Sequence, residues 1–235
     1  THLSYINAGA DVIVTNTFSC RKYRLTENKV EDQFEIINET ACKLALEAKK
    51  LSKKNIIIAG SLPSQRDSYV IDNREVRDIE KDMLEQAIIL NDYVDFLYLD
   101  VISSLSEVEA AMNISKNLNK KILIGIHLKK NGMLPSNEKL SDLFKISEDS
   151  NILGIICACV SPEISIKALK DFKNCKKPYG FKVNLWKIDE PGPIKTFNTA
   201  KPDEIGANPN ISFGIRDDVS LNDFYKISKD MVDNG

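Results

Sequence analysis

The sequence predicts an α/β fold, a (β/α)₈ barrel of the TIM type, and two observations carry the prediction. Short runs rich in Val, Ile and Leu alternate with amphipathic helical stretches along the chain. Such nearly continuous apolar runs are typical of parallel strands that helices cover, and the stretches between them have the length of crossover helices. Such a parallel sheet can be doubly wound or closed as a barrel. Because a chain of this length can form a single domain if it is an α/β barrel, we predict one barrel domain over residues 1–235.

Six apolar runs are predicted to form strands. They are Asp11–Thr15, Asn55–Ala59, Asp95–Val101, Lys121–Ile126, Ile152–Cys159 and Gly180–Asn184. A complete barrel of this type has eight strands. Both ends of the chain look cut, because it opens on Thr1 without an initiator Met and closes on Asn234 and Gly235, a helix-stop signal. We expect the first and last strands to lie outside residues 1–235.

The segments between these runs carry apolar residues three or four positions apart and charged residues on the opposite face, which predicts helices. They are Val30–Leu51, Asp78–Asn91, Leu105–Asn117, Leu140–Glu148, Pro162–Asp171 and, at the end, Asp217–Asp233. A short helical stretch that stops at Gly9 opens the chain. The stretch Ile188–Asn210, rich in Pro, Gly and Asn, is predicted to be a long loop.

Composition narrows the function classes. The 32 basic and 34 acidic residues give a net charge of −2, and the lysines form no basic stripe, which argues against nucleic acid as a partner. No apolar run approaches the roughly 20 residues of a membrane span. We expect a soluble, cytoplasmic protein with its five cysteines reduced. A homo-oligomer is left open.

In barrels of this type the site lies at the carboxyl ends of the strands. The residues there form a polar set with one acid and two thiols: Thr15-Asn16-Thr17-Phe18, Gly60-Ser61-Leu62-Pro63, Asp100, His127, Cys157-Ala158-Cys159 and Asn184. Cys157 and Cys159 alternate onto the same face of a regular strand. If Cys159 binds a metal ion, Cys157 could therefore be a second ligand of the same ion. Packing in the core is the interpretation of Cys157 that we favour.

These stretches resemble the homocysteine S-methyltransferase family, which includes betaine- and S-methylmethionine-dependent enzymes and a module of cobalamin-dependent methionine synthase. The opening string from His2 to Asp11, followed by Thr15-Asn16-Thr17-Phe18, is similar to the start of that domain. Five later stretches resemble family segments in the same order: Gly60–Tyr69, Asp95–Ala110, Cys159–Glu163, Pro178–Asn184 and Arg216–Gly235. The resemblance spans nearly the whole chain.

The resemblance implies a zinc-dependent transfer of a methyl group from a sulfonium or quaternary-ammonium donor to the thiol of homocysteine, giving methionine. Zn²⁺ held by three Cys thiolates binds the substrate sulfur and keeps it deprotonated near neutral pH. Cys159 matches the family's first zinc-binding Cys. The other two form an adjacent pair that we expect beyond Gly235.

The resemblance also implies a set of substrate-binding residues. Asp100 stands where the family has Glu, and would pair with the amino group of homocysteine. Thr15 would contact the substrate carboxylate or amine, and Phe18 would line the pocket beside the methyl donor. Asn16 and Asn184 would orient the substrate or the loops. The residues alone leave other roles open: a helix cap for Asp100, and turn formation for the two Asn residues.

Two departures from the family pattern bear on activity. Ala158 replaces the Asn that precedes the zinc-binding Cys, and Asp100-Val101 replaces a Glu-Thr pair. Loss of a group that orients a metal ligand typically costs about 10–100-fold in metal affinity or activity. Two alternatives therefore stand beside the main prediction: a diverged family member that methylates another thiol, and a non-catalytic barrel. The two histidines, His2 and His127, are distant in sequence and predict no metal site.

Overall fold

The computed structural model describes residues 1–187 and 213–234, and its α/β architecture agrees with the prediction. Six parallel strands form a single sheet in the order in which they occur along the chain. They are β1 (Val12–Val14), β2 (Ile57–Leu62), β3 (Phe96–Ile102), β4 (Ile122–Ile126), β5 (Ile152–Val160) and β6 (Tyr179–Val183).

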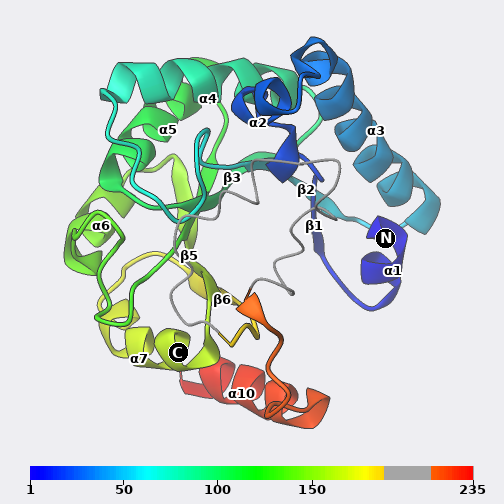
Figure 1. Ribbon diagram of the computed structural model, residues 1–235. Coiled ribbons are helices and arrows are strands. Elements are labelled where there is room, and N and C mark those ends of the chain that lie inside the picture. Colours follow the sequence, from blue (N-terminus) through cyan, green and yellow to red (C-terminus); the bar gives the residue numbers. More distant parts are fainter. Residues whose placement is uncertain (188–212, 235) are drawn as a thin grey trace.

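The sheet curves into a half-barrel with the helices on its outer side (Figure 1). The helices are α1 (His2–Asn7), α2 (Lys22–Glu27), α3 (Phe34–Ser52), α4 (Val76–Asn91), α5 (Leu105–Leu118), α6 (Leu140–Ser147), α7 (Pro162–Phe172) and α10 (Leu221–Asn234). Each strand hydrogen-bonds to the next along the chain, with a helix between the two, which is the geometry of consecutive βα units.

Two differences between the observed and the predicted helices have local causes: two short elements were missed, and the last helix begins later. Helix α2 and the 3₁₀ turn Phe18–Cys20 were not predicted, because both are too short to show a full apolar period. Helix α10 begins at Leu221 rather than at Asp217. The Ser220 hydroxyl accepts a hydrogen bond from the backbone N–H of Asp223 at 3.2 Å, and the Asp223 carboxylate accepts one from the N–H of Ser220 at 3.0 Å. This reciprocal capping sets the helix start.

The main core lies between the outer face of the sheet and the helices. Alternate strand residues such as Leu97, Leu99, Ile155 and Cys157 pack there against apolar residues of the helices. Strands β3 and β4 approach closely at Gly125, where a Cβ atom would lie 2.4 Å from the carbonyl oxygen of Leu99. The intervening residues of the same strands face the interior of the half-barrel, where the polar strand ends lie.

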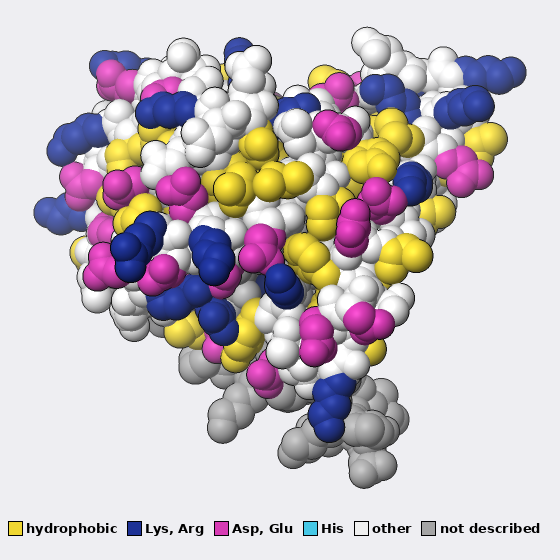
Figure 2. Space-filling view, turned by 90° about the horizontal axis from the view of Figure 1, so that it is seen from above, with side chains coloured by type: hydrophobic (Ala, Val, Ile, Leu, Met, Phe, Trp, Pro, Cys, Tyr) yellow, Lys and Arg dark blue, Asp and Glu magenta, His cyan; other side chains and the backbone are white. Residues whose placement is uncertain are grey.

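The surface is mixed in charge. Figure 2 shows Lys and Arg side chains interspersed with Asp and Glu over the face that it draws. None of the helices within the described ranges is both long enough and apolar enough to cross a membrane. The predicted loop Ile188–Asn210 lies outside the described residues.

Candidate active site

A chain of hydrogen bonds joins the carboxyl ends of four strands. The backbone N–H of Ser61, in β2, donates to Thr15 Oγ1 at 3.0 Å, next to β1. The Ser61 hydroxyl donates to Asp100 Oδ2 in β3 at 3.4 Å. Asp100 Oδ1 accepts from Lys182 Nζ in β6 at 2.7 Å. Thr15, Ser61 and Asp100 are all buried, so the network is an ordered polar layer inside the half-barrel.

Counting protons in this layer limits what Thr15 can do. Thr17 Oγ1 donates its single proton to the carbonyl oxygen of Ser61 at 2.7 Å. In the 2.8 Å contact between Thr15 Oγ1 and Thr17 Oγ1, Thr15 must then be the donor. Thr15 also accepts from Ser61 N, so it retains one acceptor lone pair and no proton. Of its two predicted partners, this arrangement suits an amine and not a carboxylate.

Asp100 does not cap the following helix, so that alternative is wrong. Helix α5 is capped by Ser104, whose hydroxyl accepts from the backbone N–H of Glu107. Asp100 instead forms an ion pair with Lys182, whose ammonium also lies 5.5 Å from the ring centroid of Tyr98. An acid and a base that are 82 positions apart in sequence therefore meet inside the half-barrel.

A β-bulge decides where the two thiols point. The pairing of β5 with β6 shifts between Ala158 and Val160, and Cys159 between them has a φ of 57°. One inserted residue reverses the alternation of side chains. Cys157 therefore packs in the core against the helices, whereas Cys159 joins an interior cluster with Val101 and Ala158. The expectation that both thiols share one face was wrong, and the structure places Cys157 in the core.

The strained backbone marks Cys159 as a candidate functional residue, since left-handed conformations of non-glycine residues cluster at such sites. Burial raises the pKa of the Cys159 thiol, although the positive charge of Lys182 and a hydrogen bond from Tyr69 act to lower it. Burial also acts to lower the pKa of Lys182, but the negative charges of Cys159 and Asp100 outweigh it and raise that pKa. Lys182 therefore stays cationic at neutral pH.

An aromatic group lies beside Cys159. The ring of Tyr69, from the loop after β2, is 6.4 Å from that of Trp186 at an interplanar angle of 90°, and 4.8 Å from the ring of His127. Trp186 in turn packs against Phe213 at 4.8 Å. Tyr69 and Trp186 belong to the same interior cluster as Cys159. Aromatic faces next to the thiol offer a surface that attracts cations.

The remaining predicted site residues are less engaged with this network. Phe18 is half-buried, and its ring lies 5.0 Å from the guanidinium carbon of the buried Arg21. Asn16 is exposed. The side-chain oxygen of Asn184 accepts a hydrogen bond from the backbone N–H of Trp186 at 3.3 Å, which is a turn-forming contact. The structure therefore gives Asn184 the turn role that the sequence left open.

Cys159 is one thiolate donor of the kind that zinc prefers. Within residues 1–187 and 213–234, no three side chains of His, Cys, Asp or Glu come together in a metal-binding arrangement. Cys159 thus fits the role of one zinc ligand, and the described residues do not supply the further ligands that a complete site needs. The cysteine pair expected beyond Gly235 lies outside the chain described.

Glu107 ties together the segments that follow β2 and β3, the strands that carry Ser61 and Asp100. Its carboxyl group is fully buried and accepts hydrogen bonds from the Ser64 hydroxyl, from the Ser103 backbone N–H at 2.8 Å and from the Ser104 hydroxyl at 3.1 Å. Burial raises the pKa of Glu107 to about 7, against these hydrogen bonds, which lower it. These contacts hold the segments after β2 and β3 against the start of α5.

This pKa predicts a pH-dependent stability. Because the folded pKa is above the ordinary value of 4.5, the folded state holds the proton more tightly, and stability falls as pH rises from about 4.5 through 7. Glu107→Gln removes this titration. We expect the free energy of unfolding of the wild type to fall by about 2–3 kcal/mol relative to Glu107→Gln between pH 5 and pH 8, measured by urea denaturation. Glu109→Gln, on the exposed face of α5, is the control. An equal pH dependence in wild type and Glu107→Gln would contradict the assignment.

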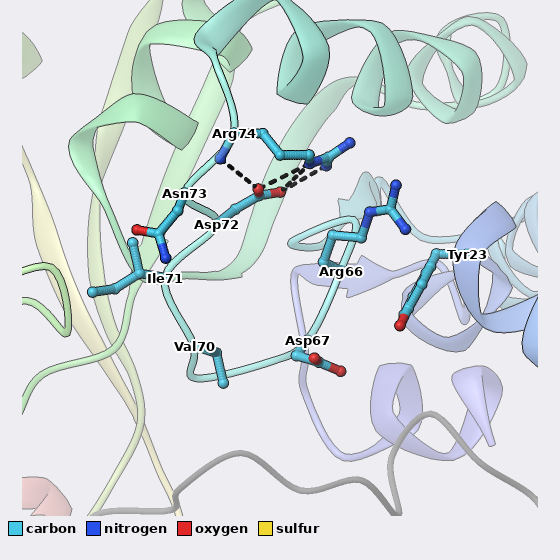
Figure 3. Close-up of a pocket in the computed structure, with 8 residues that line it drawn as sticks. All are labelled: Tyr23, Arg66, Asp67, Val70, Ile71, Asp72, Asn73 and Arg74. Carbon is cyan, nitrogen blue, oxygen red and sulfur yellow. Dashed lines mark hydrogen bonds and ion pairs between the residues drawn. The ribbon is translucent and has the colours of Figure 1, made fainter.

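A separate cavity of about 260 Å³ lies in the loop between β2 and α4 (Figure 3). The residues that line it include Tyr23 of α2, Arg66 and Arg74. Arg74 is paired with Asp72 and Asp82, each at 2.7 Å, so its charge is balanced. None of the predicted site residues lines this cavity, which borders the loop that carries Tyr69.

The sequence prediction missed Lys182, Tyr69 and Trp186 as parts of the site. Lys182 had a visible signal, because it is the one charged residue in the strand Tyr179–Val183. A lysine within an otherwise apolar strand needs a partner. Tyr69 and Trp186 lie in irregular segments, and no sequence period marks their direction.

The fold and the site together define an α/β half-barrel with a strained thiol, an acid–lysine pair and aromatic rings at the carboxyl ends of its strands. The family model for homocysteine S-methyltransferase matches residues 1–227. The chain therefore belongs to the homocysteine S-methyltransferase family, as the motifs predicted.

Individual relatives are distant. The chain is 24% identical over 186 residues to S-methylmethionine–homocysteine S-methyltransferase BHMT2 of Pongo abelii, and 23% identical over 185 residues to that of Rattus norvegicus. Each match covers 78% of this chain and 48% of the relative, so the chain spans about half the length of these relatives. The crystal structure of metallated homocysteine methyltransferase MmuM from Escherichia coli superposes with a TM-score of 0.69 at 18% identity, covering 80% of this chain and 71% of that one. This likeness supports the fold.

Proposed function

We propose that the protein transfers a methyl group from a sulfonium or quaternary-ammonium donor to the thiol of homocysteine, giving methionine, in a zinc-dependent reaction. The observation that carries the proposal is the position of Cys159. The chain belongs to this family, and its β-bulge turns the Cys159 thiol into the half-barrel, beside the Asp100–Lys182 pair. In this proposal the intact protein is a single, complete (β/α)₈ barrel domain.

The polar layer supplies the acceptor subsite. Asp100 accepts from the ammonium group of homocysteine, and Thr15 offers its remaining lone pair to the same group. Phe18, Asn16 and Asn184 are proposed to border the substrate, Asn184 through the turn that it holds. An ammonium fixed at the strand ends points the homocysteine thiol toward a defined position, which is how positioning lowers the barrier to transfer.

Cys159 is proposed as one of the zinc ligands, and the other two remain predicted beyond Gly235. Zinc, when bound, keeps the acceptor sulfur as a thiolate that is still nucleophilic. In the transfer, the bond between the methyl carbon and the donor's sulfur or nitrogen breaks as the bond to the homocysteine sulfur forms. The donor leaves as a neutral thioether or tertiary amine, and the thiol proton is lost to solvent.

The aromatic group supports a cationic donor. Tyr69 and Trp186 pack in the same cluster as Cys159, and a methyl carried by a positive sulfur or nitrogen gains cation–π stabilisation from such rings. S-methylmethionine and betaine both have this chemistry. The named relatives are S-methylmethionine–homocysteine methyltransferases, so we place S-methylmethionine first.

Metal analysis of the intact protein, combined with assays of methionine formation from homocysteine and each donor, tests the proposal. We expect stoichiometric zinc, turnover with S-methylmethionine or betaine, and loss of turnover after chelation with recovery on adding Zn²⁺. The absence of zinc together with no turnover for either donor would reject the enzyme and favour the non-catalytic barrel.

A second candidate is methyl transfer to another thiol, favoured by the departures at Ala158 and Asp100 from the family pattern. Turnover of S-methylmethionine with other small thiols but not with homocysteine would establish it. A cytoplasmic location and a homo-oligomeric assembly also remain predictions.

A further inference from the structure

Lys182 combines a buried partner with a reachable charge. Its ammonium is 2.7 Å from Asp100 Oδ1, yet the Lys182 side chain is 49% exposed while that of Asp100 is 10% exposed. Lys182 pairs in register with Ala158, the residue before Cys159. The cation is therefore held at the wall of the half-barrel next to the candidate zinc ligand, and the described residues leave about half of its side chain uncovered.

The hydrogen-bonding capacity of Lys182 is only partly used. An ammonium group has three N–H donors. Asp100 is its one hydrogen-bond acceptor within the described residues, and the centroid of the Tyr98 ring lies 5.5 Å from the ammonium. Asp100 fixes the direction of the lysine, so its remaining donors are oriented before a ligand arrives. A pre-oriented cation of this kind suits a carboxylate.

The ion pair also has a polarity that matches an amino acid. Thr15 retains an acceptor but no proton, and Asp100 is an acceptor, so this side of the layer suits an ammonium group. Lys182 is the donor on the other side. An α-amino carboxylate can lie across the pair with each charged group next to its opposite.

We propose that Lys182 binds the carboxylate of the methyl acceptor and determines specificity for thiols that carry a carboxylate. This proposal rests on the proposed function, since it concerns the same site. A purely structural ion pair is the competing explanation: in that case Lys182 only neutralises the buried Asp100 and touches no ligand.

The test uses thioethers that resemble the product and lack a thiol, so that their binding does not depend on a zinc–sulfur bond. Methionine has both charged groups, 3-(methylthio)propylamine lacks the carboxylate, and 4-(methylthio)butanoate lacks the amine. Dissociation constants are measured by calorimetry for wild type and Lys182→Met. In the wild type we expect loss of the carboxylate to weaken binding about 10- to 100-fold, the strength of a hydrogen bond between charged groups.

In Lys182→Met, methionine and 3-(methylthio)propylamine are expected to bind within about threefold of each other, since a pairwise interaction vanishes once either partner is removed. Lys182→Arg should restore most of the difference. Lys81→Met, on the exposed face of α4, removes an equal charge away from the site and is the control. If Lys182→Met unfolds because Asp100 is left unpaired, the double variant Asp100→Asn/Lys182→Gln, which removes both charges, takes its place.

The outcomes separate the two proposals. Methionine formation by the wild type, with an unchanged penalty for losing the carboxylate in Lys182→Met, overturns the role of Lys182 and leaves the proposed function standing. Lys182-dependent binding of 4-(methylthio)butanoate without any methyl transfer rejects the proposed function and supports the carboxylate site. Failure of the wild type to bind any of the three thioethers overturns the inference.

Discussion

Under the proposed function, Cys159→Ser is expected to abolish zinc binding and to lower methyl transfer to homocysteine by about 10³-fold or more. A serine hydroxyl fits the same bulge, but it stays protonated where a thiol ionises, and it is not a zinc ligand of the kind found in such sites. A Lewis-acid metal supplies several kcal/mol of charge stabilisation, and each 1.36 kcal/mol corresponds to tenfold in rate. Metal content and kcat/KM measured on the same sample check this prediction.

Cys157→Ala is the matched control, two residues away in the same strand. Because the bulge sends Cys157 into the core against the helices, we expect normal zinc content and normal kcat/KM, with a modest loss of stability. Circular dichroism and thermal unfolding confirm that both variants fold. Full zinc content and full activity in Cys159→Ser would show that the strained thiol is not a ligand.

Asp100→Asn is expected to lower kcat/KM for homocysteine about 10- to 100-fold. The amide keeps the shape of the side chain but loses the negative charge that orients Lys182 and that we propose meets the substrate ammonium. A hydrogen bond to a charged group is worth about 1.5–3 kcal/mol, which corresponds to this range. Steady-state kinetics with homocysteine as the varied substrate measure the change.

Asp100→Glu tests whether the length of this side chain matters, because the family motif that this stretch resembles has Glu at the position of Asp100. We expect Asp100→Glu to stay within about tenfold of wild type, since the charge is retained. Asp171→Asn, exposed on α7, removes an equal charge elsewhere and should leave kinetics unchanged. If Asp100→Asn matches wild type in kcat/KM, Asp100 is a structural partner of Lys182 and not a substrate ligand.

Much of the fold followed from local patterns. The predicted runs at Asp95–Val101 and Lys121–Ile126 differ from β3 and β4 by one residue at most at each end. Strand β2 was placed too early: it continues through Ser61 to Leu62, beyond the predicted end at Ala59. Gly60 and Ser61 are poor strand formers, and the pairing of Gly60, Ser61 and Leu62 with Leu97, Tyr98 and Leu99 of β3 extends the strand over them.

The sequence predicted where the site lies, but not which side chains interact within it. Strand ends are visible in a sequence, so Thr15, Asp100 and Cys159 could be chosen from it. The partner of Asp100 is 82 positions away in sequence, and the direction of Cys159 depends on a bulge between two strands. The raised pKa of Glu107 likewise depends on burial that no local pattern shows.

The sequence by itself determined the alternation of strands and helices, the parallel order of the sheet, the polar character of the strand ends and, through six motifs in order, the family. Those features depend on the spacing of apolar residues and on short motifs, both of which are visible in neighbouring positions of the sequence. Only the tertiary structure decided that Cys159 faces the interior while Cys157 does not, and that Lys182 meets Asp100 beside it. Register, bulges and charge pairing depend on contacts between distant segments, and the free energies involved arise only once the sheet has formed.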